Sequence, residues 1–282
     1  MMMFNNDFMK AVAAPMVAAI ITSGLVTGSA VAAEDEAPGV AFPDKYMLRL
    51  GAYFVDGTDT QFSVNSPLGL GAVIDYQRDL GGESRDTIPR IDAYYRFNER
   101  HRIDFTTFAI DRKGSTTLAI DITIGDENFS EEETINSDIK YTLYKLGYAY
   151  SFYHSPKVEL SFTAGLNITS YDLSFSTSTG DKAEAAGFTA PLPMFGLRMG
   201  YAITPKWSVQ YLAESFFIEF EDSFKGALVS YELSTEYKLF KHFAIGAGLA
   251  RMGTNVEVND DNWKGQVSDS YRGYTLFGTF YF

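Results

Sequence analysis

Apolar and polar residues alternate with a period of two along most of the chain after residue 45. Residues 157–168 show this pattern most clearly, because every second residue from Val158 to Ile168 is apolar or small. Such alternation is typical of β-strands that present one apolar and one polar face. Beyond the N-terminal region, the sequence has no run of the roughly 18 apolar residues that a membrane-spanning helix requires. The pattern therefore predicts an all-β protein, either a soluble sandwich or a transmembrane barrel.

The spacing of turn residues distinguishes these two architectures. Short turns are predicted at 98–100, 154–156, 204–206 and 240–242. Longer polar connections are predicted at 113–138, 176–190, 221–226 and 255–270. Short turns on one rim and long loops on the other are typical of an outer-membrane barrel, whereas a sandwich distributes its loop lengths over both ends. The pattern favours a transmembrane antiparallel up-and-down β-barrel.

Four short turns and two terminal strands predict a barrel of about ten strands. The predicted ranges are 45–56, 88–97, 101–112, 139–153, 157–170, 191–203, 206–220, 226–239, 242–254 and 271–282. Residues 57–87 also alternate and leave three alternatives, an extracellular hairpin, an inward-folded segment, or two more strands that would make twelve. Residues 113–138 are expected to rise above the membrane as hairpin arms. Shifts of the apolar face near Ser215 and between Ile168 and Tyr171 predict β-bulges.

The end of the chain carries a more specific pattern. Residues 274–282 read YTLFGTFYF, and Tyr274, Phe280 and Phe282 fall on one face of this strand. The segment resembles the C-terminal strand of Gram-negative outer-membrane β-barrel proteins, which ends in an aromatic residue. The resemblance is to the superfamily and to no particular subfamily. It implies that the three aromatic residues form the signal that the barrel-assembly machinery reads, and that the protein lies in the cell outer membrane.

The N-terminal region has the composition of a secretory signal peptide. Lys10 precedes an uncharged apolar stretch that ends in small residues, so cleavage is expected after Ala32 or Ala33. A retained membrane anchor is the alternative, and either Met1 or Met9 could be the true start. The predicted division of the chain is a signal peptide at 1–33, a flexible periplasmic tether at 34–44 and an outer-membrane β-barrel at 45–282.

Composition and charge narrow the possible functions. The chain has 282 residues and no cysteine, which excludes disulfides and thiolate chemistry. Its 23 Lys and Arg residues against 36 Asp and Glu give a net charge of −13, so binding to nucleic acid is not expected. Aromatic residues crowd the approaches to predicted short turns at 94–97 and 148–153, as in the interfacial girdle of an outer-membrane barrel.

The polar faces of the predicted strands carry many charged residues. If the apolar faces contact lipid, seven positive and six negative side chains point into the lumen. They are Arg49, Arg90, Asp92, Arg96, Arg102, Asp104, Lys145, Glu159, Arg198, Glu214, Glu232, Glu236 and Lys238. A barrel of about eight strands is just filled by its side chains, and unpaired ions are costly in so narrow a space. We therefore expect a closed network of ion pairs, with a solvated lumen lining as the alternative.

The excess of acidic residues falls in the predicted long connections. One interpretation is a plainly solvated surface, and another is that divalent cations bridge these carboxylates to anionic lipopolysaccharide. Asp260 and Asp261 are weak candidates for a Ca²⁺ site, because the residues around them lack the spacing of an EF-hand loop. The partners expected from the sequence are outer-membrane lipids, lipopolysaccharide and the assembly machinery.

Catalysis is not expected. The three histidines, His101, His154 and His242, all lie at predicted short turns, far from a substrate in the outer leaflet. General-base catalysis requires contact within about 3 Å. The sequence therefore predicts no catalytic residue and no cofactor, and favours an envelope structural or surface-interaction protein with a largely filled lumen. A narrow passive channel for small solutes is the first alternative, and an outer-leaflet lipid-modifying enzyme is the second.

Overall fold

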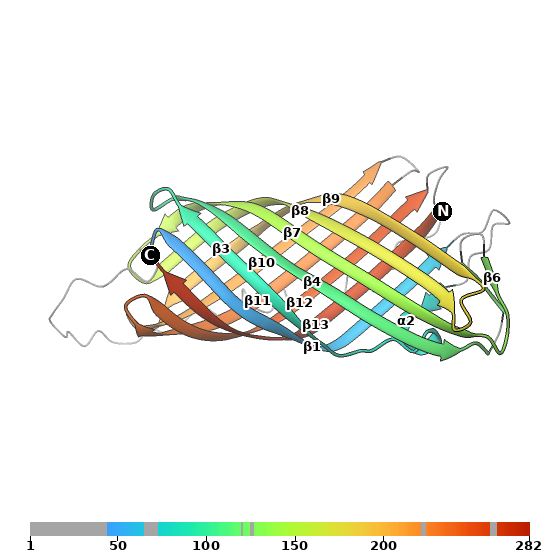
Figure 1. Ribbon diagram of the computed structural model, residues 1–282. Helices are drawn as coiled ribbons and strands as arrows, with labels where there is room; N and C mark the ends of the chain where they lie inside the picture. The colour runs from blue at the N-terminus through green and yellow to red at the C-terminus, as the bar shows by residue number, and fades with distance from the viewer. Residues whose placement is uncertain (1–43, 65–72, 120, 125–126, 221–223, 260–263) are drawn as a thin grey trace, which may run out of the picture. The chain divides into compact units, whose positions relative to one another are not determined.

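The protein forms a closed antiparallel β-barrel of ten strands in a computed structural model (Figure 1). The structure describes residues 44–64, 73–119, 121–124, 127–220, 224–259 and 264–282. The predicted signal peptide, its cleavage site and nearly all of the predicted tether lie outside these residues. The fold class predicted from the sequence is confirmed.

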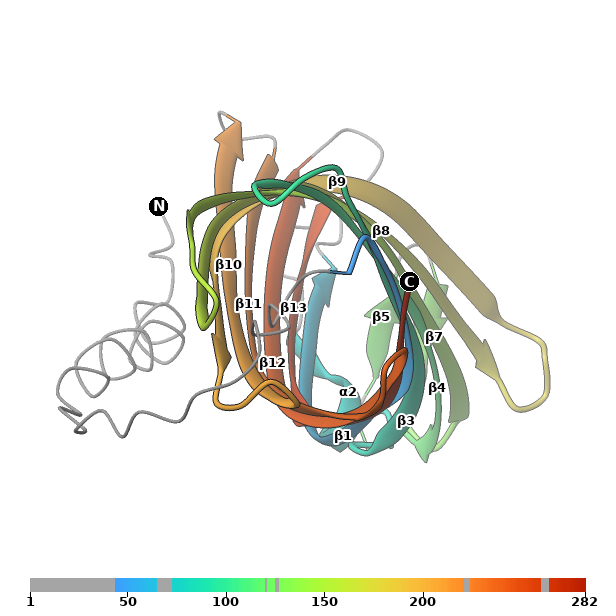
Figure 2. The same cartoon turned by 90° about the vertical axis from the view of Figure 1, so that its left-hand side faces the viewer.

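The barrel strands follow one another around the wall in chain order. They are β1 (Tyr46–Val64), β3 (Asp86–Arg96), β4 (His101–Thr117), β7 (Thr134–His154), β8 (Val158–Thr177), β9 (Ala183–Ala202), β10 (Trp207–Phe220), β11 (Phe224–Phe240), β12 (Phe243–Asn259) and β13 (Lys264–Tyr281). The first and last strands pair from Met47↔Tyr281 to Val64↔Gly265, which closes the cylinder. Figure 2 shows this closed wall from the end that carries the short turns. Closure leaves no free strand edge in the wall. The backbone N–H and C=O groups of a free edge would have no hydrogen-bond partners in lipid.

The four predicted short turns are confirmed, but the strands are longer than predicted at the opposite end. Strand β7 has 21 residues, and β8 and β9 have 20 each, whereas a membrane-spanning strand needs only about 9–11. Much of what the sequence indicated as long loops is therefore strand. Residues 113–117 pair with 134–138, as expected for rising hairpin arms. Residues 255–259 likewise pair with 264–268.

Apolar side chains change sides along the barrel wall. In β8, Phe162 and Ile168 are exposed on the outer face, whereas Tyr171, Leu173 and Phe175 are buried on the inner face. Exposed apolar residues form a band around the lower wall, which adjoins the short turns. Its members include Leu50, Ile91, Phe105, Leu146, Phe162, Phe195, Leu197, Leu233, Leu249 and Leu276. Above this band the outer face becomes polar and the inner face apolar, which is the arrangement expected where the wall leaves lipid for water.

The two predicted β-bulges are wrong for this reason. The β8–β9 pairing runs without a shift from Val158↔Tyr201 to Ser176↔Ala183. The β10–β11 pairing is equally regular, and Phe216 points inward against an apolar cluster of Leu192, Met194, Leu228 and Val256. The apolar residues change face because the surrounding medium changes, and the alternation itself is not interrupted. Register shifts do occur between 55 and 57, 151 and 153, and 238 and 240.

A large apolar cluster fills the upper barrel. It draws on β1, β3, β4, β7, β8 and β13, and its members include Tyr53, Ile88, Ile110, Ile135, Ile139, Tyr141, Leu143, Tyr171, Leu173, Phe175, Val267 and Tyr271. The ring of Tyr141 stands edge-on to Tyr171, with centroids 4.9 Å apart. We call this group the upper core. It makes the upper barrel resemble the interior of a soluble protein.

Residues 73–82 lie beside β1 beyond the end of β3 and contribute side chains to the upper core. Strand β2 (Val73–Asp75) pairs with β1, and helix α2 (Tyr76–Asp79) follows it, so this part of 57–87 adds no spanning strand and the barrel has ten. Tyr76 and Leu80 are buried in the upper core. Gly82 packs so tightly on Tyr76 that a Cβ there would lie 2.1 Å from ring carbon Cε1. We call residues 73–82 the strap.

The remaining described elements lie outside the barrel wall. Strands β5 (Ile122–Ile124) and β6 (Glu127–Phe129) form a small separate hairpin above β4 and β7 (Figure 1). Phe129 of this hairpin is fully buried and belongs to the upper core. Among the described residues, no helix is long and apolar enough to cross a membrane.

Candidate functional site

The lower barrel encloses a polar interior, to which strand alternation directs the charged side chains. The structure places all seven positive and six negative residues named from the sequence on the inner face. They form ion pairs in six groups, and only one of these uses a partner that the sequence did not indicate. We call this set the lumen network.

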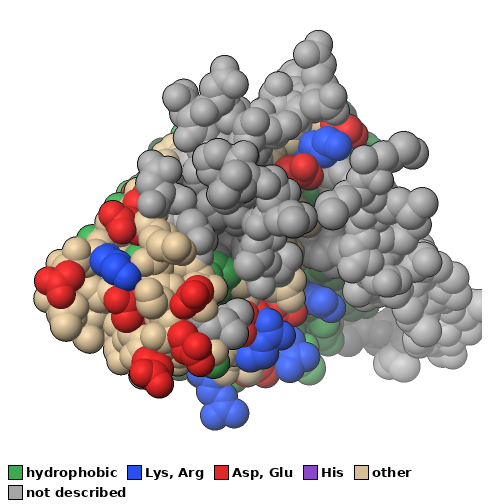
Figure 3. All heavy atoms as spheres, turned by 90° about the vertical axis from the view of Figure 1, so that its right-hand side faces the viewer, with side chains coloured by type: hydrophobic (Ala, Val, Ile, Leu, Met, Phe, Trp, Pro, Cys, Tyr) green, Lys and Arg blue, Asp and Glu red, His purple; other side chains and the backbone are tan. Residues whose placement is uncertain are grey.

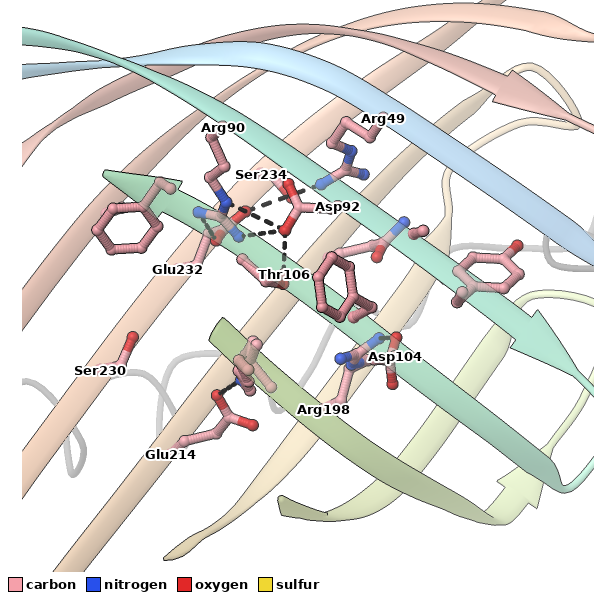
Figure 4. A pocket seen from close by; sticks show the side chains of 18 of the residues that line it. Arg49, Arg90, Asp92, Asp104, Thr106, Arg198, Glu214, Ser230, Glu232 and Ser234 are labelled. Carbon is pink, nitrogen blue, oxygen red and sulfur yellow. Dashed lines mark hydrogen bonds and ion pairs between the residues drawn. The ribbon is translucent and has the colours of Figure 1, made fainter. Parts of the chain in front are cut away.

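The first group joins β1, β3 and β11. Arg90 contacts Asp92 at 2.9 Å and Glu232 at 2.8 Å, and Arg49 lies 3.8 Å from Glu232. Thr106 Oγ1 donates a hydrogen bond of 2.8 Å to Asp92. Figure 4 shows these side chains pointing toward one another across the barrel. Two arginines and two carboxylates therefore balance in charge at the centre of the lumen.

Glu236 on β11 anchors the second group. It accepts hydrogen bonds from Arg49 at 3.3 Å, from Thr279 Oγ1 at 2.7 Å and from the Tyr281 hydroxyl. The Arg49 guanidinium carbon also lies 3.9 Å from the centre of the Phe277 ring. These contacts link β1 to β11 and β13, so the place where the cylinder closes is also held from inside.

Small residues on β12 make room for this group. A Cβ on Gly246 would lie 2.2 Å from the Phe277 ring, so only glycine lets that ring lie flat against the wall. Gly246 thus leaves space for a bulky neighbour. Phe277 in turn supports the Arg49 guanidinium, because cations are attracted to an aromatic face.

The third group lies nearest the short turns. Arg96 on β3 holds both carboxylate oxygens of Glu159 on β8, at 2.8 and 3.1 Å. Both side chains are only 5% exposed. Ser151 donates a further hydrogen bond to Glu159. Such a two-point arginine–carboxylate contact fixes geometry as well as charge.

The remaining three groups complete the lumen network. Asp104 bridges Arg102 at 3.1 Å and Arg198 at 3.2 Å, and Lys145 pairs with Glu214. Lys238 pairs with Asp44, at 2.8 Å. Residue 44 was expected in a mobile tether, so sequence reasoning did not identify this pair.

A cavity lies between the lumen network and the upper core. Its volume is about 130 Å³, enough for a few water molecules. Charged residues line its sides, and Tyr53, Phe108 and Leu143 are among the apolar residues above it. Buried nitrogens of Arg102 and Arg198 have no hydrogen-bond partner within the described chain, and internal water would satisfy them. Side chains of both the lumen network and the upper core surround this space.

One further ion pair lies within the upper core. Arg112 on β4 is 3.9 Å from Asp269 on β13 and donates to Thr60 Oγ1 at 3.1 Å and to the Tyr271 hydroxyl at 2.9 Å. Its guanidinium also lies 5.1 Å from the Tyr76 ring of the strap. The sequence placed Asp269 in a loop, so this pair was missed. The only signal was a charge at an inward position of each strand.

The upper rim is mainly acidic on its described surface, where Asp and Glu side chains stand among fewer Lys and Arg (Figure 3). Lys182 contacts Glu133 at 2.9 Å, and its ammonium holds the pKa of that carboxyl below its ordinary value. In the described residues, no three His, Asp or Glu side chains gather as a metal site would require. The weak Ca²⁺ candidates Asp260 and Asp261 lie outside the described residues.

The three histidines lie at the short-turn rim, as predicted. The closest approach to a catalytic arrangement involves His154, whose Nδ1 is 3.8 Å from Glu159, with Ser151 nearby. Ser151 donates its hydroxyl to Glu159 and not to the imidazole, and Arg96 occupies both oxygens of Glu159. The acceptor of the Ser151 proton is therefore a carboxylate that an arginine already holds, and this arrangement differs from a serine paired with a histidine base.

Comparison with known proteins identifies the fold. No family model and no curated protein matches the chain. The structure is similar to the outer membrane protease OmpT from Escherichia coli, with a TM-score of 0.58 and 9% identity over 86% of this chain and 98% of that one. The outer membrane protein OprG from Pseudomonas aeruginosa gives a TM-score of 0.40 and 13% identity over 85% and 96%. At such identities the first likeness shows the fold alone.

Proposed function

We propose that this outer-membrane β-barrel of the Gram-negative type is a non-conducting envelope protein with a structural and surface-interaction role. The observation that carries the proposal is the double filling of its interior. Ion pairs cross the lower barrel, and the upper core occupies the barrel above them. A solute would have to displace both layers to pass.

The lower layer opposes passage because its charges are already paired. Arg90, Glu232 and Asp92 hold one another across the lumen, and a passing ion would have to replace these contacts. Breaking a buried pair leaves a charge without a partner, which typically costs several kcal/mol. A static ion-pair network is therefore a barrier, whereas the lining of an open pore exchanges its contacts with water.

The upper layer opposes passage because most of its side chains are apolar and buried against one another. Tyr141 and Tyr271 are buried in it, and Tyr76 and Leu80 of the strap are buried in the same cluster. Its ion pair, Arg112 with Asp269, is internally matched, and an additional unpaired ion would be costly among close-packed apolar side chains. The strap is also fastened to the wall, since Gln77 accepts a hydrogen bond of 3.2 Å from the Thr60 amide and donates one of 2.7 Å to Thr58.

The outward surfaces support the proposed interactions. Tyr274, Phe280 and Phe282 are exposed on the outer wall, where the assembly machinery could contact them. Exposed carboxylates at the upper rim, Glu131 and Glu132 among them, suit bridging by divalent cations to lipopolysaccharide. Outer-membrane barrels include enzymes, but the interior geometry described above favours a protein without catalytic activity.

A narrow channel is the second candidate, because the cavity of about 130 Å³ leaves some space inside the barrel. Conductance in planar bilayers separates the two functions. We expect the purified protein to show no steady conductance steps under conditions in which a porin added to the same bilayer conducts. Steady steps whose ion selectivity changes when Glu232 is replaced by Gln would contradict the proposal, because they would place the conducting path in the lumen.

A further inference from the structure

The short-turn rim carries a ring of basic side chains, in contrast to the rest of the molecule. One exposed lysine or arginine stands at each of the four turns, and another precedes β1 beside the end of β13. They are Lys45, Arg100, Lys157, Lys206 and Lys241. We call these five residues the basic ring. Its presence is notable in a chain whose net charge is −13.

The strand order spaces these charges evenly around the barrel. The turns join β3 to β4, β7 to β8, β9 to β10 and β11 to β12, and Lys45 stands where β13 meets β1. Every second gap between strands therefore carries one cation at this end. A docking site for a single protein would gather its charges on one side, whereas charges distributed around the whole perimeter face the lipids that surround a barrel.

The basic ring lies at the depth of the lipid headgroups. Aromatic residues that are exposed on the outer wall adjoin it, including Phe97, Tyr153, Tyr201, Trp207 and Phe240. Tyr94, which the sequence assigned to this girdle, instead points inward against Met47, Ala244 and Tyr281. Exposed rings of this kind mark the boundary between hydrocarbon and headgroups. Lysines beside them can extend their charged ends to the same headgroups.

The basic ring is available for an external anion. The acidic residues nearest to it are engaged inside the barrel, since Asp44 pairs with Lys238 and Glu159 pairs with Arg96. Glu99 is the exposed acidic residue among the turn positions, and it stands next to Arg100. Lys45 lies 5.6 Å from the Tyr95 ring centre, which holds its ammonium at the girdle. The five cations thus face the membrane interface with little internal compensation.

We propose that the basic ring binds anionic phospholipid headgroups of the membrane leaflet at the short-turn end. The phosphate of each headgroup accepts hydrogen bonds from a lysine or arginine, and its acyl chains lie against the apolar band above. The acidic upper rim would bind anionic lipid only through bridging divalent cations, so direct binding of anionic headgroups is confined to the short-turn end. Anionic lipids would then surround the short-turn end of the barrel and help to orient it in the membrane.

Trp207 offers a direct measurement of this preference. It follows Lys206 at a turn, its ring is 44% exposed, and its indole nitrogen donates a hydrogen bond of 2.7 Å to Thr235, which fixes its position. The chain has two tryptophans, so the Trp263→Phe variant reports on Trp207 alone. This variant would be reconstituted in phosphatidylcholine vesicles that contain brominated phosphatidylglycerol or brominated phosphatidylcholine, whose bromine quenches nearby tryptophan.

We expect brominated phosphatidylglycerol to associate with the site near Trp207 about fivefold more strongly than brominated phosphatidylcholine, the factor that one nearby cation supplies at an anionic interface. Lys206→Gln in the same background should remove most of this preference. The matched control is Lys140→Gln. Lys140 is an exposed lysine on the upper half of β7, far from the short turns, so this variant should leave the preference for phosphatidylglycerol unchanged. Equal quenching by the two lipids, or an undiminished preference in Lys206→Gln, would overturn the proposal and favour an acidic periplasmic partner.

Discussion

Replacing Glu159 by Gln should lower the free energy of unfolding by about 3–5 kcal/mol, the usual result of leaving one partner of a buried ion pair unmatched. Glu159 accepts both hydrogen bonds of the Arg96 guanidinium, and the two side chains are 5% exposed. The neutral amide cannot balance the arginine charge, which then stays buried near the lower end of the lumen. Urea-induced unfolding in lipid vesicles, followed by tryptophan fluorescence, measures the loss.

Two further variants show whether this loss comes from the buried charge. The double variant Arg96→Met with Glu159→Leu should recover most of the stability, because well-packed apolar residues can replace a buried pair at little cost. Lys113→Met removes a partner of the exposed Lys113–Asp138 pair and should change stability by less than about 1 kcal/mol. If Glu159→Gln and Lys113→Met change the free energy of unfolding by similarly small amounts, the lumen network is not a buried set of ion pairs but a solvated lining.

Replacing Tyr141 by Ala should be similarly destabilising, by about 3–5 kcal/mol, because the change leaves a large cavity in a packed apolar cluster. Tyr141 is 1% exposed at the centre of the upper core, and its ring centre lies 4.9 Å from that of Tyr171 and 5.9 Å from that of Phe108. The same unfolding experiment measures this variant. Its loss tests the upper core independently of the lumen network.

The neighbouring residue provides the control for Tyr141. Lys140 is exposed on the outer face of β7, so Lys140→Ala should change stability by less than about 0.5 kcal/mol. If the apolar side of β7 faced outward along its whole length, Tyr141→Ala would not create a cavity and both variants would be mild. A mild effect of Tyr141→Ala therefore contradicts the change of face.

Period-two alternation predicted the barrel and the lumen network because it sorts side chains onto two faces. Once the apolar face was assigned to lipid, Arg90, Asp92 and Glu232 had to point inward. The same reasoning failed above the membrane, at Tyr171 and Phe216. There the strand continues without a break, but its apolar side chains point into the barrel. The alternation alone does not show whether a given part of the strand is surrounded by lipid or by water.

Contacts across the barrel were beyond sequence reasoning for a different reason. Arg112 meets Asp269, and Lys238 meets Asp44, through strands that are far apart in the chain. Which residues meet depends on the relative shift of all the strands around the cylinder, because the shift accumulates from pair to pair. Alternation fixes the face of each residue and leaves that shift open. The inward fold of Tyr76 in the strap likewise depends on the space left by the wall.

The change of face at the membrane boundary can be measured along β8. Because the chain has no cysteine, single cysteines can carry a spin label at Phe162, Ile168, Asp172 and Ser174, all on the outer face. In reconstituted vesicles, collisions with oxygen report lipid, and collisions with a water-soluble nickel chelate report water. We predict lipid exposure at 162 and 168 and water exposure at 172 and 174. Lipid exposure at all four positions would show that the wall remains in the membrane beyond Ile168 and that the apolar residues change face for another reason.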